Sequence, residues 1–143
     1  MNVLSIETPQ FKINLQIKIF DSDVNYPSNT IITVSVVCDD FSAVTDMDID
    51  IKQLIAFTDN FSMLYTTLEG NAIIQEPFGV RQYIEFCGDG RGHIYISGKL
   101  NSSGRNGFTQ ELKFENCIDQ TCISDFLAKI SALCQKYLKI TNL

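Results

Sequence analysis

The sequence lacks an apolar run that could cross a membrane. Its hydrophobic stretches are interrupted by Lys, Asp or Gln well before the roughly 20 apolar residues that a membrane helix needs. The first 20 residues also lack the basic start, the continuous apolar centre and the small-residue cleavage site of a secretory signal. We therefore expect a cytoplasmic protein that does not associate with membranes.

Recognisable metal-binding and nucleophile patterns are absent too. The chain has one histidine, His93, and five cysteines, with no CxxC pair and no Cys–His spacing typical of zinc sites. Free, reduced thiols are the expectation in a reducing compartment. Segment 46–50 (DMDID) resembles the start of a calcium loop, but Ile51 and Phe57 occupy the positions where such a loop requires glycine and glutamate. We expect no metal and no cofactor.

Positive charge is scarce in the first half of the chain. Residues 1–68 contain nine acidic side chains and three lysines, whereas residues 69–143 contain eight acids and eight bases. The whole net charge of −6 therefore belongs to the first half. Such a field repels nucleic-acid phosphates and attracts a basic protein. We expect a basic protein partner and no direct binding to nucleic acid.

The residues that are present suffice for one globular domain. The 143 residues are 45% hydrophobic and 20% charged, which is ordinary for a single folded unit. We treat residues 1–143 as one domain.

Hydrophobic periodicity predicts two similar halves. Apolar–polar alternation and β-branched runs predict a meander of strands at 11–20, 31–37 and 41–47. Helical spacing follows from about 48 to 68, with Asp50 and Gln53 as a capping box and Gly70 as the stop. In the second half, a last amphipathic helix begins near Asp119 or Thr121. It follows strand signals at 72–75, 82–87, 93–100 and 108–115.

The predicted fold class is α+β. Seven or eight strands form a mostly antiparallel, twisted sheet, and the two amphipathic helices pack on one face of it. The order of meander then helix occurs twice, as an internal duplication would produce.

This topology gathers acidic residues at one end of the sheet. Antiparallel neighbours return to the end where their predecessor began, so the turn at 21–29 meets the end of the third strand. We predict a docking patch for a basic partner made of Asp21, Asp23, Asp46, Asp48 and Asp50. The alternative is that Asp48 and Asp50 only favour a helix N-terminus while the others only solubilise the surface.

Enzyme chemistry has weaker support. The glycine-rich segment 88–93 (GDGRGH) predicts a tight hairpin, because a strand and not a helix follows it. His93 and a cysteine could form a hydrolase dyad, or His93 could serve a metal-assisted hydrolase, yet no cysteine lies in a nucleophile-type local sequence. These enzymes, and a structural subunit of a larger assembly, remain the alternatives to a protein inhibitor.

Motifs in the second half carry a family resemblance. They are GDGRGHIYISGKL at 88–100, ELKFE at 111–115 and IDQTCI at 118–123. This order resembles the WapI-type immunity proteins of bacterial polymorphic-toxin and contact-dependent inhibition systems. The chain departs from that pattern at Cys122, where an aromatic residue is usual, and near Ser124, where a proline is usual.

The resemblance implies a small cytoplasmic protein, a monomer or weak dimer, that binds and blocks the C-terminal domain of a cognate toxin. Such toxins are often nucleases. Motif residues such as Gly92, His93, Gly98 and Gln120 also suit roles in the fold, so the resemblance assigns no toxin contacts.

Overall fold

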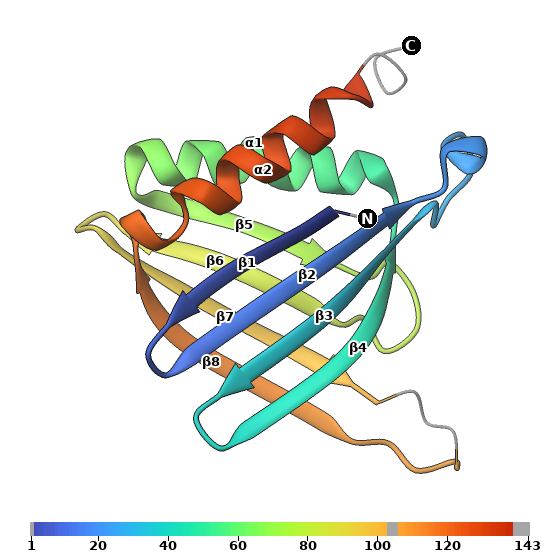
Figure 1. Cartoon of the computed structure of the whole chain (residues 1–143), viewed down its shortest axis with the longest axis horizontal. Helices are drawn as coiled ribbons and strands as arrows, with labels where there is room; N and C mark the ends of the chain where they lie inside the picture. The colour runs from blue at the N-terminus through green and yellow to red at the C-terminus, as the bar shows by residue number, and fades with distance from the viewer. Residues whose placement is uncertain (1, 103–105, 139–143) are drawn as a thin grey trace.

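The structure is a computed structural model that describes residues 2–102 and 106–138. Each half of the chain contains four antiparallel strands followed by a helix (Figure 1). The elements of the first half are β1 (Asn2–Thr8), β2 (Phe11–Ile19), the 3₁₀ turn η1 (Asp21–Asp23), β3 (Thr30–Cys38), β4 (Phe41–Ile49) and α1 (Ile51–Thr67). Those of the second half are β5 (Glu69–Gln75), β6 (Tyr83–Asp89), β7 (His93–Asn101), β8 (Glu111–Asp119), the 3₁₀ turn η2 (Gln120–Cys122) and α2 (Ser124–Gln135).

The predicted α+β class is confirmed. The strands form two four-stranded antiparallel sheets, β1-β2-β3-β4 (sheet A) and β5-β6-β7-β8 (sheet B), in place of one sheet. Helix α1 separates the two meanders in the chain, so β5 starts a new sheet instead of extending β4. Strand β1, which we did not predict, pairs with β2 and buries Leu4 and Ile6.

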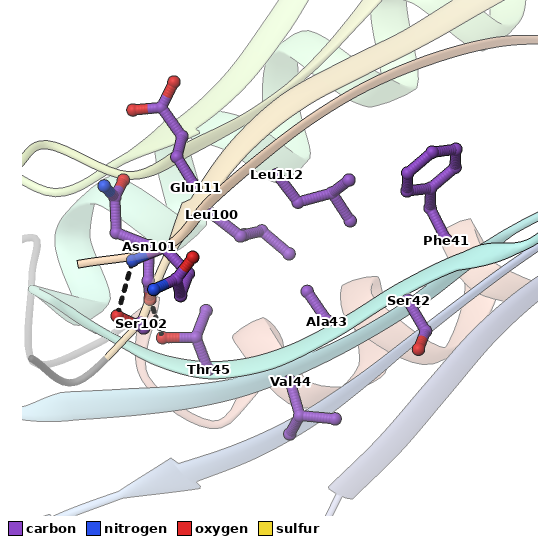
Figure 2. Close-up of a pocket in the computed structure, with 11 residues that line it drawn as sticks. Phe41, Ser42, Ala43, Val44, Thr45, Leu100, Asn101, Ser102, Glu111 and Leu112 are labelled. Carbon is purple, nitrogen blue, oxygen red and sulfur yellow. Dashed lines mark hydrogen bonds between the residues drawn. The ribbon is translucent and has the colours of Figure 1, made fainter. Parts of the chain in front are cut away.

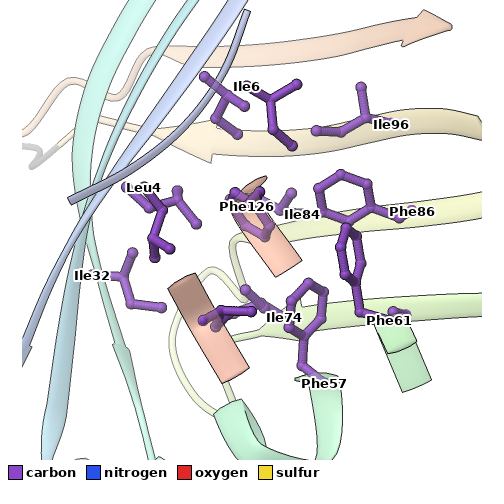
Figure 3. Close-up of a cluster of buried hydrophobic side chains, with 14 of the residues drawn as sticks. Leu4, Ile6, Ile32, Phe57, Phe61, Ile74, Ile84, Phe86, Ile96 and Phe126 are labelled. Carbon is purple, nitrogen blue, oxygen red and sulfur yellow. The ribbon is translucent and has the colours of Figure 1, made fainter. Parts of the chain in front are cut away.

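The two helices close one side of the molecule. Helix α1 contacts β5 and β6, while α2 contacts β1 and α1, so together they cover the gap between β1 and β5 (Figure 1). Phenylalanine rings from α1, β6 and α2 gather at the centre of the core (Figure 3). Phe61 lies 4.8 Å from Phe86 and 5.4 Å from Phe126 between ring centroids. Burial of each ring contributes about 1.5–3 kcal/mol to stability.

The ends of the helices differ in part from the prediction. Asp50 caps α1, since its carboxylate accepts a 2.8 Å hydrogen bond from the Lys52 N–H. The reciprocal half of the predicted capping box does not form, because Gln53 Oε1 is buried without a hydrogen-bond partner among the described residues. At the other end Leu68, not a glycine, takes the left-handed conformation, and its carbonyl accepts a hydrogen bond from the Gly90 N–H. Helix α2 begins at Ser124, later than predicted, because β8 continues to Asp119 and η2 follows it.

Within the described residues, neither helix has the length and apolar character needed to cross a membrane.

Candidate partner-binding surface at the open edge

The two sheets diverge at the edge strands far from the helices. A cleft of about 330 Å³ opens there between β4 and the neighbouring ends of β7 and β8 (Figure 2). Its lining comprises Phe41, Ser42, Ala43, Val44 and Thr45 from β4, and Leu100, Asn101, Ser102, Gln110, Glu111 and Leu112 from the second sheet and its β7–β8 connection.

The inward-facing row of β4 is uncovered at this cleft. Met47 and Ile49 in the second half of the strand are fully buried, whereas Phe41 at its start is 68% exposed. Figure 2 shows Ala43 and Leu112 directed into the space between the strands, with Val44 directed away from it. Part of the apolar inner surface of sheet A is therefore accessible to a partner.

The backbone edge of β4 is open at the same place. β4 pairs only with β3, and residues of an antiparallel strand alternate in which neighbour their backbone groups face. The Asp46 carbonyl accepts from Gln82 Nε2 at 2.9 Å, and the Asp48 N–H donates to Glu76 Oε2 at 3.2 Å, so even-numbered residues face away from β3. By this alternation, Ser42 and Val44 also direct their backbone N–H and C=O groups to the open edge. These groups form no hydrogen bond with any described residue.

A polar cluster seals the remainder of that edge. Gln82 is buried, and its side chain joins Asp46 O to the Asn101 N–H, which donates to Gln82 Oε1 at 2.9 Å. Thr45 Oγ1 donates to the Asn101 carbonyl at 2.9 Å. Asn101 Oδ1, in contrast, is buried and has no hydrogen-bond partner among the described residues. The open stretch is thus confined to the first half of β4.

The predicted acidic patch is divided by the structure. Asp46 and Asp48 lie two residues apart on the outer face of β4, and Asp46 accepts a 2.7 Å hydrogen bond from Thr33 Oγ1. Asp23 lies in η1 at the same end of sheet A as the end of β4. Asp50 is occupied as the cap of α1. Asp46 and Asp48 are therefore the predicted acids that lie on β4 itself, in its second half next to the open stretch.

Asp21 is tied to α2. Its carboxylate accepts a 2.6 Å hydrogen bond from the hydroxyl of Tyr137, just beyond the end of that helix. This hydrogen bond raises the pKa of Tyr137 to about 12, with smaller contributions from burial and from the negative charge of Asp21. The side chain of Asp21 thus has a structural partner within the chain.

Sequence reasoning missed two acids beside the cleft. Asp39 and Asp40 form the β3–β4 turn, directly before Phe41, and the predicted docking patch did not include them. With the three predicted acids that follow, segment 39–50 holds five carboxylates and no lysine or arginine. Glu111 lies on the opposite wall, where the Lys113 ammonium is 3.9 Å from its carboxylate. The run of acidic residues without a lysine or arginine was the sequence feature that could have identified these two acids.

The residues considered for catalysis have structural partners. His93 Nδ1 lies 3.0 Å from Asp89 Oδ2, and Asp89 Oδ1 accepts from the Arg91 N–H at 2.7 Å. The hydrogen bond from the Arg91 N–H, and after it the contacts with His93, lower the pKa of Asp89. Burial raises the thiol pKa of Cys87 and of Cys134, which disfavours the nucleophilic thiolate. Across the described part of the chain, no three His, Cys, Asp or Glu side chains form a group that could hold a metal ion.

Comparison with protein families gives one match of nearly full length. The model of the immunity protein WapI-like family matches residues 3–138. The chain belongs to this family. Membership in the WapI-like family implies an immunity function against a toxin, and it confirms the resemblance seen in the second-half motifs. A comparison with curated proteins gave no match.

The motif residues of this WapI-like protein serve the fold. A Cβ atom added to Gly98 would lie 2.5 Å from Phe114 Cζ, so only glycine leaves room for that ring. Gly92 has a positive φ of 99° in the β6–β7 turn. Gln120 Nε2 donates to the Tyr65 carbonyl at 2.6 Å and holds η2 against α1. None of these residues lines the cleft.

Proposed function

We propose that this WapI-like protein neutralises the C-terminal domain of a cognate toxin by stoichiometric binding in the cytoplasm, and that this domain is a basic nuclease. The observation that carries the proposal is the open edge of β4, where an uncovered apolar cleft adjoins segment 39–50, which holds five carboxylates and no lysine or arginine. A nuclease needs a basic surface to hold phosphates, and an acidic inhibitor competes for the same surface while gaining a fast association rate.

The predicted acids contribute in different ways. Asp46 and Asp48 meet the toxin domain directly from the outer face of β4, with Asp23 near the same end of the sheet. Asp50 and Asp21 position the adjoining helix and turn through their hydrogen bonds to Lys52 and Tyr137.

Co-expression tests the function. The C-terminal domain of a candidate cognate toxin is expressed in bacteria with and without the protein. We expect growth arrest with the domain alone and recovery with both. With the purified proteins, we expect complete inhibition of nucleic-acid cleavage at a molar ratio of 1:1. Arrested growth in the presence of abundant, folded inhibitor would reject the proposal.

The enzyme alternative is tested in the same assay. His93→Ala removes the only imidazole, and we expect full protection because His93 only closes a hairpin. Protection at a strongly substoichiometric ratio, lost in a folded His93→Ala variant, would instead favour a hydrolase.

A further inference from the structure

From the open edge of β4 we infer the manner of docking: a basic, extended segment of the partner adds to sheet A as a fifth strand, with its apolar side chains in the cleft. This inference rests on the proposed function. Strand addition to an exposed sheet edge is a general mode of recognition in which backbone hydrogen bonds supply affinity and side-chain pockets supply selectivity.

The backbone groups needed for strand addition are in place. Ser42 and Val44 present N–H and C=O groups to the open edge. Further along, Gln82 already donates to the Asp46 carbonyl, and Glu76 accepts from the Asp48 N–H. An added strand would lie about 4.8 Å from β4. Its pairing is therefore directed to the first half of β4, beside the cleft.

The cleft matches one side of such a strand. Alternate residues of an added strand point to opposite faces, so one row enters the cleft beside Phe41, Ala43 and Leu112. Burial of these partly exposed side chains favours apolar residues in that row. Asn101 also lines this cleft, and its Oδ1 is a buried acceptor without a hydrogen-bond partner among the described residues.

The acidic residues beside the open edge favour a basic partner segment. The outward row of the added strand would lie beside Asp46 and near the Asp39–Asp40 turn. The sequence from residue 39 to residue 50 contains no lysine or arginine. Lysine or arginine in that row would pair with these carboxylates. A second copy of this chain paired edge to edge would instead bring two acidic strands together, which opposes self-association.

A proline on the open edge tests the inference. Val44→Pro removes the N–H that an added strand would use, and the fold does not need this N–H because it faces away from β3. With the purified toxin domain, we expect about a tenfold or greater rise in Kd, corresponding to about 1.4 kcal/mol for the lost pairing. Val44→Thr keeps the N–H and the β-branched shape, so its Kd should change less than about threefold.

Amide hydrogen exchange provides a second reading on the unmodified protein. The N–H groups of Ser42 and Val44 should exchange rapidly in the free protein and become protected when the toxin domain is bound. Unchanged exchange at both amides in a fully formed complex would overturn the inference. This measurement uses the wild-type protein, so it decides the question even if Val44→Pro does not fold. Equal affinities of folded Val44→Pro and Val44→Thr would overturn it as well.

The outcomes separate the two proposals. If the wild-type protein does not bind the toxin domain, the proposed function fails and the docking mode fails with it. If the wild-type protein binds and Val44→Pro binds equally, only the docking mode fails. A concentration-dependent dimer in sedimentation that Val44→Pro abolishes would assign the edge to a second copy and would also overturn the inference.

Discussion

Asp21 illustrates how one side chain in a predicted docking patch can be committed to the fold. Its partner Tyr137 is 116 residues away in the chain, so no local pattern could reveal their 2.6 Å hydrogen bond. The same holds for Gln82, whose burial between the sheets follows only from the meeting of β4 and β7. In contrast, the cap at Asp50 was predictable, because its partner lies two residues away.

The Asp21–Tyr137 contact predicts a pH dependence. The folded-state pKa of Tyr137 is raised from 10.0 to about 12, so the folded protein holds this proton more tightly than the unfolded chain. The stabilisation is therefore complete below pH 10 and is lost as the pH rises towards 12. Tyr137→Phe should lower the free energy of unfolding by about 1 kcal/mol at neutral pH, since the hydrogen bond is largely exposed.

Urea titrations of the two proteins across the alkaline range measure this difference. All other ionisable groups are common to the two proteins, so their contributions cancel in the comparison. A difference between wild type and Tyr137→Phe that stays constant up to pH 12 would contradict the assignment of the hydrogen bond.

At the scale of elements, strand existence was easier to predict than strand limits. The alternation in 11–20 and the β-branched run in 31–37 identified β2 and β3, because one face of each strand is buried. The prediction of 108–115 was displaced from β8, which spans Glu111–Asp119. The limits of β8 are set by its register with β7, in which Gly98 pairs with Phe114, and periodicity alone does not contain that register.

Strand β7 offers a test of this register. Gly98→Ala should destabilise the protein by about 1–3 kcal/mol, because the new methyl group meets the Phe114 ring and the Tyr83 carbonyl. Ser97→Ala, which changes the opposite face of the same strand, should alter stability by less than about 0.5 kcal/mol. Denaturation in urea measures both, and equal stabilities of the two variants would contradict the close packing at Gly98.

At the scale of the whole molecule, the net charge of each half of the sequence does not describe the charge of the surface that this half forms. The second half has no net charge, yet the strands of sheet B carry two lysines and six acids: Glu69, Glu85, Asp89, Glu111, Glu115 and Asp119. The described bases of this half lie also on α2 and in the loops at Arg81 and Arg91. A test of the role of charge in binding must therefore vary the location of the charges while keeping their total equal.

Two charge-matched variants make that test. Asp46→Asn with Asp48→Asn, and Asp59→Asn with Glu115→Gln, each remove two negative charges from a total of −6. The first pair lies on β4 and the second lies on α1 and β8. We expect the first variant to associate with the toxin domain about tenfold more slowly and with a flatter salt dependence, and the second to change far less. Equal slowing of both, measured by stopped flow, would show that only total charge matters.

Local patterns in the sequence were enough to predict the α+β class, the repeated order of strands and helix, Asp50 as the cap of α1, the hairpin at 88–93 and the family. Each of these depends on residues close together in the chain or on side-chain periodicity. Three features became visible only in the folded molecule: the strands divide into two sheets, Asp21 pairs with Tyr137, and the first half of β4 stays open beside a cleft. These features arise where distant segments meet, and local patterns carry no information about which segments do so.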